Sequence, residues 1–213
     1  MLIPPLHPPA TWWGASVSLA VPATLLMGVM LAVVSDGQGL SRAGKGAAAR
    51  DTVAANRDQS GAALVTGILL GIGIVGFIDE AVFHQLLQWH NFYWDTSDTG
   101  RILSDGLFHV VSTLLLLWGT YRLWRGPAPH ARVLLAGTLL GGGGFNAYDG
   151  IVQHIILHLH LVNEYVCAMP QSGDNSVFTC PHDIPFEVVW IGVGLALVGA
   201  GLALWRTRPV RRA

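Results

Sequence analysis

The stretch GIGIVGFIDEAVFHQLLQWH, residues 71–90, decides the fold, because it is apolar and of membrane-spanning length yet carries carboxylates and imidazoles. About 70 residues later the chain repeats the pattern as GGGFNAYDGIVQHIILHLH. Both copies contain D-x4-H-x5-H, formed by Asp79, His84 and His90 and again by Asp149, His154 and His160. The identical spacing predicts a duplication, with a site built between the two copies.

The composition predicts a polytopic membrane protein. Hydrophobic residues make up 52% of the chain, charged residues only 12%, and the mean hydropathy is +0.48. Windows of about 20 residues, the length that spans the hydrocarbon core, predict helices at 12–34, 62–90, 104–124, 132–158 and 184–205. We therefore expect an all-α membrane protein with five transmembrane helices.

The expected organisation has three parts. Residues 1–34 form an N-terminal extension with an added transmembrane helix, and residues 35–60, rich in Gly, Ala and charge, form a cytoplasmic linker. Residues 61–213 form a four-helix membrane core with a short cytoplasmic tail. Within it DGLFHVV, residues 105–111, aligns with DIPFEVV, residues 183–189. These alignments predict that the core consists of two repeated hairpins related by an axis along the membrane normal.

The basic residues predict the topology. Of the twelve Lys and Arg residues, all but Arg101 fall in segments 42–57, 122–132 and 206–212. By the positive-inside rule these segments are cytoplasmic, which places the N-terminus and the loops at about 91–103 and 159–183 outside a bacterial inner membrane, and the C-terminus inside. Cys167 and Cys180 share an outer loop, where a disulfide is expected. A metal clip formed with His182 is the alternative.

Helical spacing predicts a metal site at the outer ends of the core helices, because residues four apart share a helix face. The expected metal ligands are His84, His109, His154, His158, Glu187 and Asp105. Glu80 and Asp79 are candidate general bases, while Asp149, His90 and His160 are expected to orient the ligands from a second layer. Imidazole and carboxylate suit Zn, Fe, Cu or Mn, as one ion or two.

Other readings of these residues stay open. A single haem b between His84 and His154 is the less favoured cofactor, since two stacked haems need same-helix histidines about 13 or 14 residues apart. The polar groups could also form a proton relay or a structural network, and Asp105 and Asp183 could be helix N-caps. Glycines at three- and four-residue intervals in 67–76 and 137–144 predict close contact between the two duplicated helices.

Two functional classes fit these expectations. The first is a metal-dependent hydrolase or oxidase that acts on a lipid or a small apolar substrate. The second is a non-enzymatic protein that binds or delivers a metal ion such as copper, although the scarcity of Met and thiolate near the site disfavours Cu(I). The lipid bilayer is an expected partner, and no nucleic acid is expected.

The segments GFIDEAVFHQLLQWH, SDGLFHVVST and FNAYDGIVQHIILHLHLV resemble those of a bacterial family of predicted integral membrane proteins, domain of unknown function 2243. The resemblance covers about residues 60–206. It implies a four-helix membrane core and no assigned activity. The positions that it implies are Asp79, His84, His90, Asp105, His109, His154 and His160.

Overall fold

The computed structural model describes residues 47–167 and 180–207, and within them the chain is helical. The elements, in order, are α2 (Ala47–Ile78), the π-helix η1 (Asp79–Leu86), α3 (Asp98–Arg125), α4 (Ala131–Tyr148), the π-helix η2 (Asp149–Ile156), the short 3-10 helix η3 (Glu164–Val166) and α5 (Ile184–Arg206). The helix expected at 12–34 lies outside the described residues. So does the part of the expected linker before residue 47.

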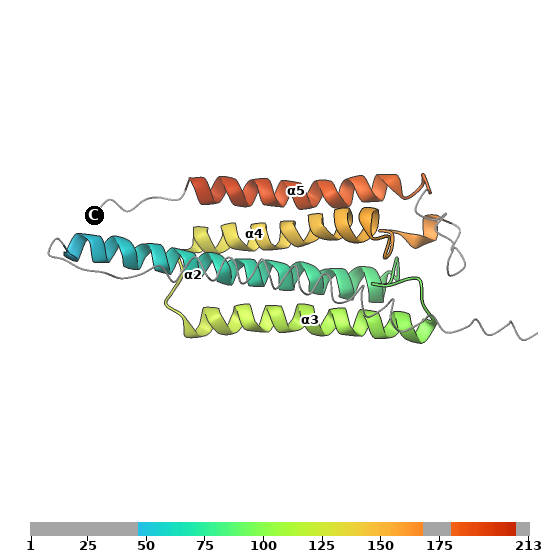
Figure 1. Ribbon diagram of the computed structural model, residues 1–213, viewed down its shortest axis with the longest axis horizontal. Helices are drawn as coiled ribbons and strands as arrows, with labels where there is room; N and C mark the ends of the chain where they lie inside the picture. Colours follow the sequence, from blue (N-terminus) through green and yellow to red (C-terminus); the bar gives the residue numbers. More distant parts are fainter. Residues whose placement is uncertain (1–46, 168–179, 208–213) are drawn as a thin grey trace, which may run out of the picture.

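The four long helices lie side by side in the order α3, α2, α4, α5 (Figure 1). The most extensive contact is between α2 and α4, and α3 and α5 pack on the outer sides of this central pair. Within the part of the chain that the structure describes, three helices are long and apolar enough to cross a membrane, namely Gln59–Leu86, Asp98–Arg125 and Ile184–Arg206. Large apolar side chains on their surfaces are exposed, as expected for helices that face lipid.

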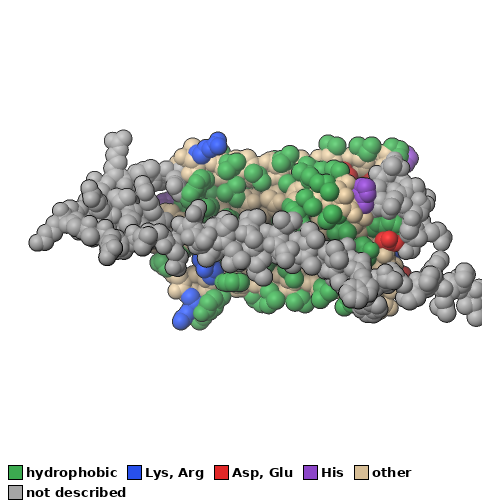
Figure 2. Space-filling model, in the orientation of Figure 1, with side chains coloured by type: hydrophobic (Ala, Val, Ile, Leu, Met, Phe, Trp, Pro, Cys, Tyr) green, Lys and Arg blue, Asp and Glu red, His purple; other side chains and the backbone are tan. Residues whose placement is uncertain are grey.

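Side-chain types separate along the helices. On the face shown in Figure 2, Lys and Arg lie at one end, histidine and acidic side chains lie toward the other end, and hydrophobic side chains lie between them. We call these the basic end and the histidine end. This separation places any site made from the histidines at one end of the helices.

Glycines allow the backbones of α2 and α4 to touch. A Cβ atom at Gly71 would collide with the carbonyl oxygen of Thr138, and one at Gly141 would collide with that of Ile68. Small residues permit such close approach between membrane helices. The contact predicted from the glycine spacing is therefore confirmed, and it brings the helices' histidine ends together.

Both central helices change geometry at the repeated aspartate. From Asp79 and from Asp149 onward the chain is π-helical, and the backbone N–H groups of Leu87 and Leu157 donate across five residues, at 2.8 Å in both cases. The helices then end, with Gln88 and His158 both at φ 52°. The helix expected at roughly 62–90 thus begins earlier, at Ala47, and ends at Leu86, with its candidate membrane span at Gln59–Leu86. The helix expected at roughly 132–158 ends at Ile156.

The two loops that follow the π-helices exchange backbone hydrogen bonds. The Trp94 N–H donates to the Leu159 carbonyl at 3.1 Å, and the Glu164 N–H donates to the Trp89 carbonyl at 2.9 Å. The two donors, Trp94 and Glu164, are 70 residues apart, and so are the two acceptors, Trp89 and Leu159; 70 is the offset of the repeat. The loops therefore form a closed cap over the ends of α2 and α4.

A disulfide completes this cap. Cys167 and Cys180 are bonded, with their Cα atoms 6.1 Å apart, which confirms the expected pairing. Cys167 packs with Trp94 and Leu161 in a small apolar cluster. The disulfide thus ties the segment before α5 to the loops above the histidine end.

Glu164, at the start of η3, is buried in the cap with its Oε1 atom lacking a hydrogen-bond partner among the described residues. Burial raises the pKa of its carboxyl from 4.5 to about 7, with Arg101 and His84 opposing the shift and the charges of Asp105 and Asp183 adding to it. Protonation of Glu164 therefore favours the folded cap.

The first prediction tests the contact between α2 and α4. Gly71→Ala should destabilise the protein by about 1–3 kcal/mol, because the added methyl group meets backbone atoms that cannot move aside. Gly144→Ala is the matched control on α4, since a Cβ there meets nothing within 4 Å. The measurement is the apparent Tm in detergent. Equal Tm values for the two variants would show that the contact is looser than described.

The second prediction concerns pH. Because the folded pKa of Glu164 lies above its unfolded value, its contribution to stability is full below about pH 4.5 and is lost as the pH rises through about 7. Glu164→Gln should therefore match the wild type in apparent Tm near pH 4.5 and exceed it at pH 8. A Tm difference that does not change with pH would rule out this titration.

Candidate metal centre

The π-helices aim the repeated aspartate and histidine at one another. In an α-helix, residues five apart point to different faces, but hydrogen bonds from i to i+5 stack them on one face. The Nε2 atom of His84 lies 3.8 Å from Asp79 Oδ2, and that of His154 lies 3.0 Å from Asp149 Oδ2. Each π-helix therefore presents one carboxylate and one imidazole to the interior.

The third residue of each motif returns to the same place after the turn. His90 and His160 lie between His84 and His154, so that the four imidazoles form a continuous row. Ring centroids are 4.5 Å apart for His84 and His90, 4.8 Å for His90 and His160, and 4.4 Å for His160 and His154. The four rings and the two aspartates are buried, each at most 3% exposed.

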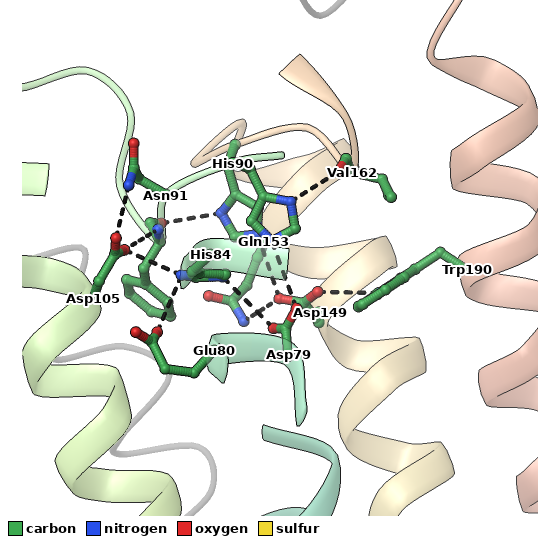
Figure 3. A network of polar contacts seen from close by, with 12 residues as sticks. Asp79, Glu80, His84, His90, Asn91, Asp105, Asp149, Gln153, Val162 and Trp190 are labelled. Atoms are coloured by element: carbon green, nitrogen blue, oxygen red, sulfur yellow. Dashed lines mark hydrogen bonds and ion pairs between the residues drawn. The ribbon is translucent and has the colours of Figure 1, made fainter. Parts of the chain in front are cut away.

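The Nδ1 atom of every ring lies against an oxygen acceptor. His84 and His154 face carboxylates of the flanking helices, Asp105 Oδ1 at 3.1 Å and Glu187 Oε1 at 2.9 Å. His90 faces the Val162 carbonyl at 2.8 Å, and His160 faces the Phe92 carbonyl at 3.0 Å, again with an offset of 70 (Figure 3). Since these oxygens only accept hydrogen bonds, each Nδ1 donates, and in a neutral ring Nε2 keeps its lone pair.

The four Nε2 atoms are buried, and among the described residues those of His84, His90 and His160 have no hydrogen-bond partner, whereas that of His154 lies 3.0 Å from Asp149 Oδ2. Their nearest carboxylate oxygens belong to the repeated aspartates. His90 Nε2 lies 3.6 Å from Asp79 Oδ1, and His160 Nε2 lies 3.7 Å from Asp149 Oδ1. Two sets of ligand atoms thus converge, each from one aspartate and two histidines.

The two halves differ around their aspartates. Asp149 accepts hydrogen bonds on both oxygens, from Gln153 Nε2 at 2.8 Å and from Trp190 Nε1 at 3.1 Å. Asp79 Oδ1 has no hydrogen-bond partner among the described residues, because Phe83 stands where the repeat has Gln153. The orientation of Asp149 is therefore fixed by donors that Asp79 lacks.

His84 contacts an additional carboxylate, that of Glu80 on its own helix, and His154 has no equivalent contact on its helix. Glu80 Oε2 lies 3.1 Å from His84 Nδ1, beside Asp105, and has no hydrogen-bond partner among the described residues. Its Oε1 atom accepts a hydrogen bond from Gln85 at 2.9 Å. The corresponding position of the second copy is Gly150. Glu80, His84 and Asp105 form a third group of convergent ligand atoms.

Asp105 does not cap its helix. Ser97 is the N-cap of α3, and Asp105 lies inside the helix, where it accepts hydrogen bonds from the Phe92 N–H and from Asn91 Nδ2, both at 2.7 Å. Asp183 does occupy the N-cap position of α5. Its Oδ1 atom, however, accepts from the Asn163 N–H at 3.0 Å and not from its own helix. Both aspartates therefore anchor the loops above the site.

The structure brings together most of the residues that the sequence singled out. The cluster contains Asp79, Glu80, His84, His90, Asp105, Asp149, His154, His160 and Glu187. His109 and His158 belong to none of the three convergent groups. The His109 ring packs against Phe77, and His158 is an exposed residue of the turn.

Two contributions were missed in the sequence. One is the pair of donors on Asp149, Gln153 and Trp190, for which the sequence carried no signal beyond their place in polar helix ends. The other is the central position of His90 and His160. The repeated spacing itself was the signal for these two, but α-helical geometry placed them away from the ligand face.

Comparison with known proteins gives a family. No curated protein and no solved structure matches the chain. Residues 66–208, which contain every residue of the cluster, match the family described as a predicted membrane protein, DUF2243. The match covers well over half of the chain. The chain belongs to the DUF2243 family of predicted membrane proteins.

Proposed function

We propose that this membrane protein holds two transition-metal ions in the histidine cluster, one between Asp79, His84 and His90 and one between Asp149, His154 and His160. The observation that carries the proposal is the orientation of the four rings. Each Nδ1 is engaged by an acceptor, and the Nε2 atoms of His84, His90 and His160 are buried with no hydrogen-bond partner among the described residues. The Nε2 atom of His154 lies 3.0 Å from Asp149 Oδ2. A buried lone pair without a donor is costly, and a metal ion satisfies it.

The spacing of the ligand atoms supports this proposal. Gaps of 3.6 to 3.8 Å between Nε2 and carboxylate oxygen, seen for three of the four rings, are too long for hydrogen bonds. They are close to the roughly 3.4 Å that separates two ligands bound to one ion at about 2.1 Å in a tetrahedral site. The donor set of nitrogen and oxygen suits Fe, Mn or Zn.

The charge of the site also favours cations. Five carboxylates contact the imidazoles of His84 and His154, namely Asp79, Glu80, Asp105, Asp149 and Glu187. Burying so much negative charge near a bilayer is unfavourable unless it is compensated. Two divalent ions would neutralise most of it while leaving the imidazoles free to act as ligands.

We infer that the two halves arose by duplication. The π-helices, the turns with φ 52° and the exchanged loop hydrogen bonds all recur with the same offset of 70. This pattern supports two hairpins related by an axis along the membrane normal. By the positive-inside rule, the Arg-rich segments support a cytoplasmic basic end, and the metal centre would then face the outside of a bacterial inner membrane.

The ligand count favours an enzyme. Two histidines and one carboxylate at each position leave coordination positions open, as in catalytic centres, whereas structural sites are fully ligated by protein. Bound ions supply Lewis-acid or redox chemistry at such positions. Glu80 Oε2, buried beside His84, can hold a proton during a reaction. Since large apolar side chains such as Leu86, Ile102 and Ile156 are exposed around this helix end, we propose a small apolar or lipid substrate for a hydrolase or oxidase.

A metal-delivery protein is the second candidate. The observation that favours it is the nearly complete burial of all six ligands, which shields bound ions from water. The two candidates differ in the open coordination positions. In Co²⁺-substituted protein, azide should shift the visible absorption bands if positions are open, and a spectrum unaffected by azide would favour delivery.

The third prediction is a metal stoichiometry. Purified protein reconstituted with Fe²⁺ or Zn²⁺ should bind two ions per chain, and His90→Ala and His160→Ala should each lose one or both. His109→Asn and His158→Asn should keep two ions, since neither ring belongs to a convergent group. Asparagine is chosen for His158 because it tolerates the positive φ of that residue. Metal analysis after desalting measures the content.

Two results would contradict the proposal. If the wild-type protein retains no ion, the histidine cluster is a structural or proton-conducting network and not a metal site. The other result is that the His109 and His158 variants lose metal while the His90 and His160 variants retain it. His109 and His158 would then be ligands, as α-helical spacing predicts, and His90 and His160 would not.

The fourth prediction concerns the difference between the halves. Because Gln153 and Trp190 hold Asp149, the ion on that side should bind more tightly than the ion beside Asp79. Titration against a chromophoric chelator should show two unequal steps. Gln153→Leu should weaken the tighter step by about 10- to 100-fold, the usual effect of losing such a partner. Phe83→Gln, which offers Asp79 a hydrogen-bond donor, should strengthen the weaker binding step. Two identical binding steps in the wild type would contradict this assignment.

A further inference from the structure

A cavity of ≈ 260 Å³ lies at the basic end, far along the helices from the histidine cluster. It is a half-open hollow between α2, the last turn of α3 and the connection to α4. The polar side chains that line it are Gln59, Thr66, Tyr121, Arg122 and Arg125, and the alanines at 62 and 63 leave the space open. None of the described residues that line it is acidic.

The two guanidinium groups have no carboxylate partner among the described residues. All ion pairs among the described residues lie in the histidine cluster. Arg122 Nε donates to Thr66 Oγ1 at 3.1 Å, and Thr66 in turn donates to the Ala62 carbonyl at 2.8 Å. These two hydrogen bonds fix the Arg122 side chain, and its terminal nitrogens make no hydrogen bond to another described residue.

Arg125 lies over the Trp124 ring, with Cζ 5.7 Å from the ring centroid. Trp124 and Tyr121 are 76% and 55% exposed. Exposed Trp and Tyr at a helix end are typical of the membrane interface, where lipid headgroups lie. The cavity is thus at headgroup depth, beside the apolar surface of α3.

We propose that this cavity binds a phosphate group, held by Arg122 and Arg125 and by the neutral donors Gln59, Thr66 and Tyr121. Arginine matches the oxygens of phosphate with paired donors, and these two guanidinium groups have no carboxylate partner among the described residues. The volume suits a single headgroup and is small for a nucleotide-sized ligand. The phosphate can come from an anionic phospholipid or from free phosphate, and basic pockets between membrane helices are suited to the first.

The fifth prediction tests the site on the full-length protein. Native mass spectrometry in detergent, with phosphatidylglycerol or phosphatidylcholine added, should show retention of phosphatidylglycerol by the wild type. Arg122→Gln and Arg125→Gln should each reduce this retention at least about tenfold, because each removes charge-assisted hydrogen bonds. Thr66→Val should reduce it without a change in charge. Arg206→Gln is the matched control, since it removes the same charge at the same end, outside the cavity.

The source of the phosphate is resolved by competition. If inorganic phosphate alone binds to lipid-free protein in the same Arg-dependent way, and phosphatidylglycerol does not, the site takes free phosphate. Binding of neither probe by the wild type, or an equal loss in the Arg206 variant, would overturn the proposal. Apparent Tm, measured in every variant, identifies any that fails to fold, and for such a variant the Thr66→Val result decides.

Discussion

The arrangement of the histidine cluster depends on the contact between the backbones of α2 and α4. Glycines at the crossing leave no side chains between the helices, so their ends emerge close together. Each end alone offers one aspartate and two imidazoles, too few to compensate the burial of their charges. Only the pair forms a continuous row of four rings, with each loop holding the Nδ1 atom of the other half's histidine.

The π-helices convert this proximity into a site. A π-helix has a less favourable backbone conformation than an α-helix and is frequently found at functional sites. Here it occurs twice, at the same point of the repeat, and it aligns residues five apart that an α-helix would separate. The turn with φ 52° then reverses the chain so that the last histidine comes back to the first. The cost of both distortions is offset by the exchanged hydrogen bonds of the loops.

The sequence was sufficient for what depends on composition and spacing. Hydropathy gave a helical membrane protein, the cysteines gave the disulfide, and the repeat pointed to His84 and His154 as its deepest histidines. It was insufficient where the backbone leaves α-helical geometry. His109 and His158 were expected as ligands because they lie four residues from a ligand candidate, a rule that holds only on an α-helix. In α3 the helix is regular, but there Asp105 faces the site and the His109 ring packs against Phe77.

The departures from symmetry carry more information about chemistry than the symmetry itself. Duplication alone would make two equivalent halves, yet the second copy has Gly150 and Gln153 where the first has Glu80 and Phe83. In the second half the aspartate is held on both oxygens, which suits an ion that stays in place. In the first half Asp79 Oδ1 lacks such a donor, and a second buried carboxylate, Glu80, lies beside the ring of His84. In the proposed function, an ion on a carboxylate without such donors, next to a second buried carboxylate, is the arrangement expected where a substrate reacts. Under the proposed function, the half built on Asp79 is therefore the candidate for reactivity and the half built on Asp149 the candidate for support.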